Sequence, residues 1–149
     1  MNKIGKITIV VVLVVAVVVV IAVKSNKSGR DTATPGGGQQ IPEEYRPEQL
    51  TGKGLPALID VGAGTCIPCK LMAPILEELK EELQGKITVQ FLDLNKYPGL
   101  AKEYRISVMP TQIFYDASGK ELYRHEAFMS KQDILAKWQE LGVDLTETE

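Results

Sequence analysis

A chain of 149 residues with 44% hydrophobic residues is long enough for one globular domain with short appendages. Its net charge is −2, and residues 48–149 are more acidic, with 11 Lys and Arg against 16 Asp and Glu. This balance argues against a nucleic-acid partner, because phosphate backbones are bound through clustered positive charge.

The first predicted element is an apolar segment near the amino terminus. Residues 7–23 contain one polar residue, Thr8, and extending the segment back to Ile4 gives about 20 residues, which would span about 30 Å as a helix. We therefore predict a transmembrane signal anchor over residues 1–23, with residues 4–23 in the membrane. A cleavable signal peptide is the alternative, because it too has a short basic region before an apolar stretch.

Either interpretation directs the chain to the export machinery. We therefore expect the soluble domain outside the cytoplasm, in the periplasm or at the cell exterior, either anchored or released by signal cleavage. A domain facing the cytoplasm is the alternative. Residues 24–47 are rich in Ser, Gly, Pro, Gln and charged residues, which predicts a flexible linker. The folded domain is then expected over residues 48–149.

The folded part begins with an apolar run, LPALIDV at residues 55–61, which predicts a buried strand containing one carboxylate, Asp60. A long helix is predicted next, and its stripe of Leu71, Ile75 and Leu79 is assigned to the core, as is Trp138 in the last helix. The other elements follow in chain order: a weak helical pattern at 47–52 before the first strand, then the long helix 66–84, strand 87–94, helix 98–104, strands 111–115 and 121–125 joined by a turn at 116–119, and helix 130–141.

The order β-α-β-α-β-β-α predicts an α/β fold in which a mixed sheet is flanked by helices on both faces. The two strands that follow the short helix are joined by a tight turn, so they are expected to be antiparallel.

Both cysteines of the chain, Cys66 and Cys69, lie at the predicted start of the long helix. Free N–H groups and the helix dipole would stabilise a thiolate at Cys66, and Pro68 fits in the first turn. Cys66 is then the exposed nucleophile, and Cys69 is the shielded thiol that resolves a mixed disulfide. Two alternatives remain, a structural disulfide that closes a short loop and a zinc site for which the chain offers only His125 besides the cysteines.

At this point the sequence resembles the thioredoxin family over about residues 55–145. The run CIPCKLMAP at residues 66–74 is similar to the active-site helix of that family, and Asp60 corresponds to its buried carboxylate. Met109, Pro110 and Thr111 correspond to the loop in which a cis-proline faces the disulfide. The resemblance implies a thioredoxin-like fold and a thiol–disulfide oxidoreductase. It implies no metal and no cofactor beyond the Cys66–Cys69 disulfide itself.

The resemblance also implies roles for single residues. Burial would raise the pKa of Asp60 toward a value useful for taking the proton from Cys69, whereas a solvated carboxylate at the strand end is the alternative. Substrate binding is expected at Met109, Pro110 and Thr111 and beside the cysteines at Ile67 and Pro68, with the cis-proline loop pairing like a strand with a bound peptide. His125 is expected to be a surface residue of undetermined role.

Several positions depart from the family pattern, including the absence of its usual glycine near Glu126 and Ala127. Thr65 and Gly62 stand where the family commonly has aromatic residues, Ile67 replaces a glycine between the cysteines, and Phe91 corresponds by spacing to a lysine. These changes predict a barer surface around Cys66 and a more apolar environment for Asp60. They favour a dedicated partner over a promiscuous one.

The residues between the cysteines also bear on the direction of electron flow. Ile67 and Pro68 provide no positive charge for a Cys66 thiolate, and an oxidant depends on a strongly stabilised thiolate. We therefore predict a membrane-tethered, monomeric reductase that acts on disulfide-containing exported proteins and takes electrons from a membrane donor protein. The alternatives are a disulfide-forming oxidant and a non-catalytic, membrane-tethered binding module.

Overall fold

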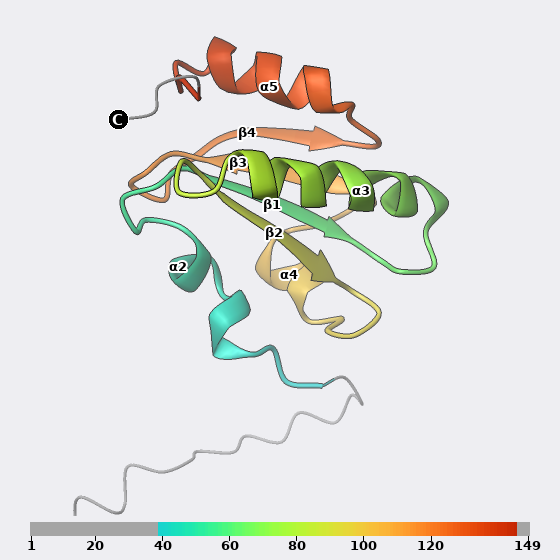
Figure 1. The fold of residues 1–149 in the computed structure, drawn as a ribbon. Coiled ribbons are helices and arrows are strands. Elements are labelled where there is room, and N and C mark those ends of the chain that lie inside the picture. Colours follow the sequence, from blue (N-terminus) through green and yellow to red (C-terminus); the bar gives the residue numbers. More distant parts are fainter. Residues whose placement is uncertain (1–38, 146–149) are drawn as a thin grey trace, which may run out of the picture. The chain divides into compact units, whose positions relative to one another are not determined.

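Four strands form one mixed sheet in the order β2-β1-β3-β4 (Figure 1). The computed structural model describes residues 39–145. The central strand β1 pairs in parallel with β2 and antiparallel with β3, and β3 pairs antiparallel with β4. The strand bounds are β1 (Ala57–Gly62), β2 (Thr88–Asp93), β3 (Thr111–Tyr115) and β4 (Glu121–Glu126).

The two longest of the described helices begin at residues whose side chains cap them. Cys66 caps the long helix α3, and the Ser130 hydroxyl accepts a hydrogen bond from the Asp133 N–H at the start of α5. The element order predicted from residue 55 onward is confirmed. The helix bounds are η1 (Glu43–Tyr45, a 3-10 helix), α2 (Pro47–Leu50), α3 (Ile67–Glu82), α4 (Leu100–Glu103) and α5 (Lys131–Glu140).

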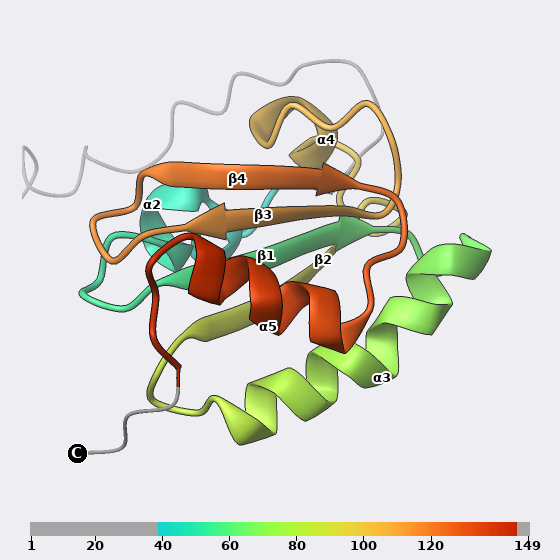
Figure 2. The same ribbon diagram turned by 90° about the horizontal axis from the view of Figure 1, so that it is seen from above.

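Helices cover both faces of the sheet, as predicted. α3 and α5 lie on one face (Figure 2), where Leu58 of β1 and Trp138 of α5 belong to the same core cluster. On the other face Ile59 of β1 packs in a second cluster with Leu100 of α4, and Tyr45 of η1 packs against that cluster. Every residue of β1 is buried, as expected for a central strand covered on both sides.

Leu71 is not part of the core, which corrects the predicted apolar stripe of α3. Its side chain is 57% exposed, whereas Leu79 is fully buried. The buried residues of α3 recur at spacings of three or four and define a different stripe, which begins at Cys69 and continues through Met72 and Leu76 to Leu79. Leu71 falls one residue off this stripe. It lies one turn after Ile67 and, like Ile67, is exposed near the start of the helix.

The predicted transmembrane helix over residues 4–23 and most of the predicted linker lie outside the described residues. Among residues 39–145, none of the helices has the length and apolar character needed to cross a membrane. The three predicted segments, 1–23, 24–47 and 48–149, therefore remain predictions.

Leu79 and Leu71 provide a matched test of the core on one helix. Leu79→Ala should lower the free energy of unfolding by about 2–5 kcal/mol, because it leaves a cavity between α3 and the sheet. Leu71→Ala should change it by about 0.5 kcal/mol or less, because the side chain is in contact with solvent. Denaturant unfolding of the oxidised protein measures both. Equal losses in the two variants would contradict the assignment of the buried stripe.

Candidate redox active site

The two cysteines form a disulfide at the start of α3. Their Cα atoms are 5.2 Å apart, and the backbone N–H of Cys69 donates a hydrogen bond of 3.2 Å to Cys66 Sγ. Cys66 is half-buried as the N-cap residue, whereas Cys69, one turn into the helix, is only 3% exposed. An incoming thiol or thiolate therefore has access to Cys66 and not to Cys69.

Gly62, the last residue of β1, lets the helix approach the sheet closely. A Cβ atom at this position would lie 2.9 Å from Cys69 Sγ, which is closer than Cβ atoms come in ordinary packing, and 3.1 Å from Cε2 of Phe91, which is a tight contact. The departure from the family pattern noted at this residue thus has a packing reason. Gly62 leaves room for the second sulfur between the end of the central strand and the aromatic ring on β2.

Asp60 lies on β1 on the same face as Gly62, because strand residues two apart share a face. Its side chain is fully buried, and Asp60 Oδ1 accepts a hydrogen bond of 2.6 Å from Nε2 of Gln112. Burial disfavours the charged form and raises the pKa of Asp60 to about 6, while the hydrogen bond from Gln112 acts in the opposite direction. The alternative of a solvated carboxylate is wrong.

Gln112 is the site residue that the sequence alone did not identify. It is a fully buried polar residue on β3, and its Cα is the register partner of Asp60 Cα. The available signal was an amide in the otherwise apolar run TQIFY at residues 111–115. A buried polar side chain requires a partner, and the only carboxylate in the neighbouring apolar run is Asp60.

The loop before β3 lies at the same end of the sheet as the disulfide. The Met109–Pro110 peptide bond is cis, as the resemblance implied. Thr111 pairs with Val61, the residue before Gly62, and its hydroxyl donates a hydrogen bond of 2.7 Å to the carbonyl oxygen of Val108. Pro110 is buried and Met109 is exposed, so this loop presents the Met109 side chain to solvent.

Large apolar side chains are exposed on the segments that meet at this end of the sheet. Ile67, near the start of α3, is 75% exposed. The loop after β4 lies against the same helix, because the backbone N–H of Met129 donates a hydrogen bond of 3.5 Å to Met72 Sδ. Pro68, between the cysteines, is half-buried. We call the exposed set the apolar rim: Ile67, Leu71, Val108, Met109 and Phe128.

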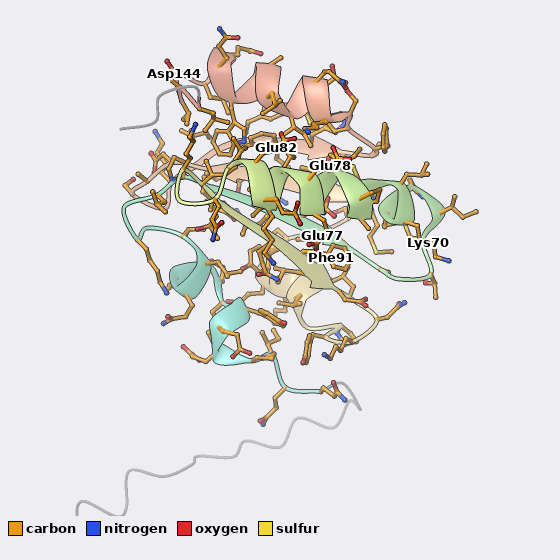
Figure 3. All side chains as sticks on the ribbon, viewed as in Figure 1. Lys70, Glu77, Glu78, Glu82, Phe91 and Asp144 are labelled. Atoms are coloured by element: carbon orange, nitrogen blue, oxygen red, sulfur yellow. A yellow bond between two sulfur atoms is a disulfide. The ribbon has the colours of Figure 1, made fainter. Side chains whose placement is uncertain are left out.

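On α3, Lys70 is the charged residue nearest to the cysteines in the sequence. Lys70 is exposed near the start of α3, and the carboxylates of Glu77, Glu78 and Glu82 are farther along the helix (Figure 3). Lys131 of α5 bridges Glu78 and Glu82 at 3.0 and 2.6 Å. The electrostatic environment of Cys66 is therefore set by the helix start and Lys70.

Neither cysteine sulfur is available as a zinc ligand in this state, because both are in the disulfide. In the described part of the chain, residues 39–145, no three His, Cys, Asp or Glu residues cluster in a way that could hold a metal ion. His125 lies half-buried on β4, with Nε2 3.3 Å from the carbonyl oxygen of Phe128. The redox group at this site is the disulfide, which belongs to the chain itself.

Comparison with known proteins agrees with this geometry. The thioredoxin family model matches residues 42–140. A thioredoxin-like protein of Synechocystis sp. is 35% identical over 92 residues, which cover 62% of this chain and 87% of that protein. The chloroplastic M-type thioredoxin of Spinacia oleracea is 43% identical over 77 residues, 52% of this chain. The chain spans about half the length or less of the chloroplastic relatives it matches.

A solved structure shows the same likeness. The crystal structure of chloroplastic thioredoxin z has a TM-score of 0.59 and 25% sequence identity, and the match covers 75% of this chain and all of that one.

The buried carboxylate makes the stability of the protein pH-dependent. Below about pH 4 Asp60 is protonated in both the folded and the unfolded chain, so folding does not have to bury a charge at this position. Between about pH 4 and 6 the unfolded chain loses this proton while the folded chain keeps it, so stability falls as pH rises. Asp60→Asn should therefore raise the free energy of unfolding by about 2–3 kcal/mol at pH 7.5 and change it little near pH 4.

Denaturant unfolding of the oxidised protein at the two pH values measures this difference. Val61→Ala, at the next residue of β1, is the control, because it changes no ionisable group and should lower the free energy of unfolding by about the same amount at both pH values. A pH-independent effect of Asp60→Asn would contradict the raised pKa.

The disulfide at the start of α3, the buried carboxylate on the central strand and the cis-proline loop occupy one end of the sheet. The chemistry that they support is exchange between this disulfide and the thiols or disulfides of protein substrates. Together with the match over residues 42–140, they show that this chain belongs to the thioredoxin family of thiol–disulfide oxidoreductases.

Proposed function

We propose that this protein is a reductase of disulfides in exported proteins, tethered to the membrane by residues 4–23. The observation that supports reduction as the direction of the reaction is that few groups stabilise a thiolate at Cys66. Its Sγ accepts one backbone N–H, from Cys69 at 3.2 Å, and the residues between the cysteines, Ile67 and Pro68, carry no charge. A thiolate held this weakly makes the disulfide the more stable form, which favours electron donation to substrates.

The reaction proceeds in two exchange steps. The Cys66 thiolate attacks a substrate disulfide, so that a Cys66–substrate S–S bond forms and the other substrate sulfur leaves as a thiolate. The Cys69 thiol then loses its proton to Asp60 and attacks Cys66 Sγ. This second step forms the Cys66–Cys69 disulfide and releases the second substrate thiolate. Two electrons have passed from the dithiol to the substrate, and a dithiol donor must restore them.

The cis-proline loop is the proposed substrate-binding segment. Pro110 has no N–H of its own, so a bound peptide would pair with the backbone of Met109 and Thr111 on either side of it. Ile67 and Pro68 would contact the substrate next to its reacting sulfur. The exposure of the apolar rim supports a substrate with apolar residues beside its cysteine.

The N-terminal sequence supports the proposed location. Residues 4–23 have the length and apolar character of a membrane anchor, and residues 24–47 have the composition of a flexible linker. An oxidising compartment outside the cytoplasm would require a membrane protein as electron donor. We propose that the domain over residues 48–149 works there as a monomer, either anchored or released after signal cleavage.

Single cysteine variants test the two exchange steps. Cys69→Ser should accumulate a mixed disulfide with substrate proteins, because Cys66 still attacks and nothing resolves the adduct. Cys66→Ser is the matched control and should trap none. Nonreducing electrophoresis of the full-length variants after acid quenching measures the adducts. Equal trapping by the two variants would contradict the division of roles, and the absence of adducts from both would leave a binding module as the function.

The reduction potential of the Cys66–Cys69 couple tests the direction. We expect a value of about −230 mV or below in a titration of the full-length protein against a thiol buffer, as for reducing members of this class. A value near about −120 mV would overturn the reductase and make the protein an oxidant.

A further inference from the structure

A row of side chains crosses the sheet beneath the N-terminal part of α3. Phe91, Asp60, Gln112 and His125 are successive register partners on β2, β1, β3 and β4. Register partners project from the same face of a sheet, with neighbouring Cβ atoms about 5 Å apart. Asp60 therefore has a phenyl ring on one side and an amide on the other, and the amide lies between it and the single histidine of the chain.

Gln112 is the one hydrogen-bonding partner of the Asp60 carboxyl group among residues 39–145. Its Nε2 lies 2.6 Å from Asp60 Oδ1, while Asp60 Oδ2 and Gln112 Oε1 are both buried with no partner among the described residues. An acid this deeply buried needs a donor when it is charged and an acceptor when it is neutral. A primary amide carries both groups on one carbon, so it can meet either need.

The surroundings of Asp60 offer no other group for this task. Phe91 on β2 is apolar, and Gly62, two residues along β1, has no side chain. The other titratable group of the row is His125, which is on the far side of Gln112. On α3 the buried titratable residue is Cys69 in its reduced form, whereas the Lys and Glu side chains of that helix are exposed. Among the residues that the structure describes, no Lys or Arg contributes to the shift in the pKa of Asp60.

We propose that Gln112 is a positioning residue that holds Asp60 in place through both of its protonation states. With Asp60 ionised, the amide N–H donates to the carboxylate. With Asp60 protonated, a half-turn of the amide presents Oε1 to the acid O–H. The two groups lie 2.6 Å apart, which is within the range for O–H···O bonds, so the turned amide would meet the acid O–H without movement of either strand.

This inference rests on the proposed role of Asp60 as the acceptor of the Cys69 proton. In that step the Cys69 S–H bond breaks, the proton moves to the Asp60 carboxylate, and the electron pair remains on sulfur for attack on Cys66. The amide neither gains nor loses a proton. Its contribution is to keep the carboxylate charged near neutral pH and to keep the resulting acid from turning away.

Gln112→Met tests the proposal, because methionine preserves the length of the side chain and removes the amide. The ionised form of Asp60 loses its donor, so its proton dissociation constant should fall about tenfold or more. Substrate reduction by the variant should slow at pH 7 and recover toward the wild-type rate as the pH rises. The readouts are the carboxyl carbon shift of Asp60 in a pH titration of the full-length protein and the pH–rate profile of insulin reduction.

Ile113→Val is the matched control, since Ile113 is the next residue of β3 and is equally buried on the opposite face. It should lower stability and leave both readouts unchanged. If Gln112→Met merely loses stability in the same way, with the titration of Asp60 unmoved, then Gln112 fills space and the proposal is overturned.

A measurement on the wild-type protein keeps the test decisive if Gln112→Met does not fold. The side-chain amide resonances of Gln112 should change with pH at the same midpoint as the Asp60 carboxyl carbon. Amide resonances that do not respond at that midpoint would overturn the proposal. The Asp60→Asn variant tests the proposed role of Asp60 separately from that of Gln112. If this substitution leaves the pH–rate profile unchanged, Asp60 does not accept the Cys69 proton, and the proposed mechanism itself fails.

Discussion

The close approach of α3 to the end of β1 is the constraint on which the rest of the site depends. Gly62 provides the space for Cys69 Sγ, because a Cβ atom at residue 62 would lie only 2.9 Å from that sulfur. This contact buries the second sulfur, whereas the first, at the helix start, is only half-buried. It also places the sulfur pair at the end of the strand that carries Asp60. The asymmetry between the two cysteines is thus a packing effect, since both belong to the same short motif.

The same packing sets a conflict between stability and chemistry. Asp60 occupies a position of the central strand where an apolar residue would be more stable, because a buried charge loses its hydration. The sheet limits that loss with one amide from the adjacent strand, Gln112. The resulting pKa of about 6 lies between that of an ordinary carboxyl group and neutral pH, so the group can take up and release a proton under mild conditions. Sites that keep such a group commonly sacrifice stability for function.

The surface around Cys66 follows a similar logic. Ile67 and Leu71 lie one helical turn apart and are exposed, although a core position would have stabilised the fold. Their exposure near the reactive sulfur matches that of Met109 on the neighbouring loop. An apolar surface kept free at a reactive group is expected where a partner covers it during the reaction. The weak charge around the cysteines leaves recognition to shape and apolar contact.

The sequence by itself determined the elements from residue 55 onward, because periodicity and capping residues such as Ser130 are local signals. It also determined the chemistry, because two cysteines at a helix start, Asp60 in an apolar strand and Met109-Pro110 form a specific combination. Only the tertiary structure decided which side of α3 faces the sheet, and so moved Leu71 from the expected core to the surface. Only the structure identified Gln112 as the hydrogen-bonding partner of Asp60 and showed that Gly62 leaves room for Cys69 Sγ. These depend on the register of strands distant in the chain and on contacts between a helix and a strand, which no local pattern records.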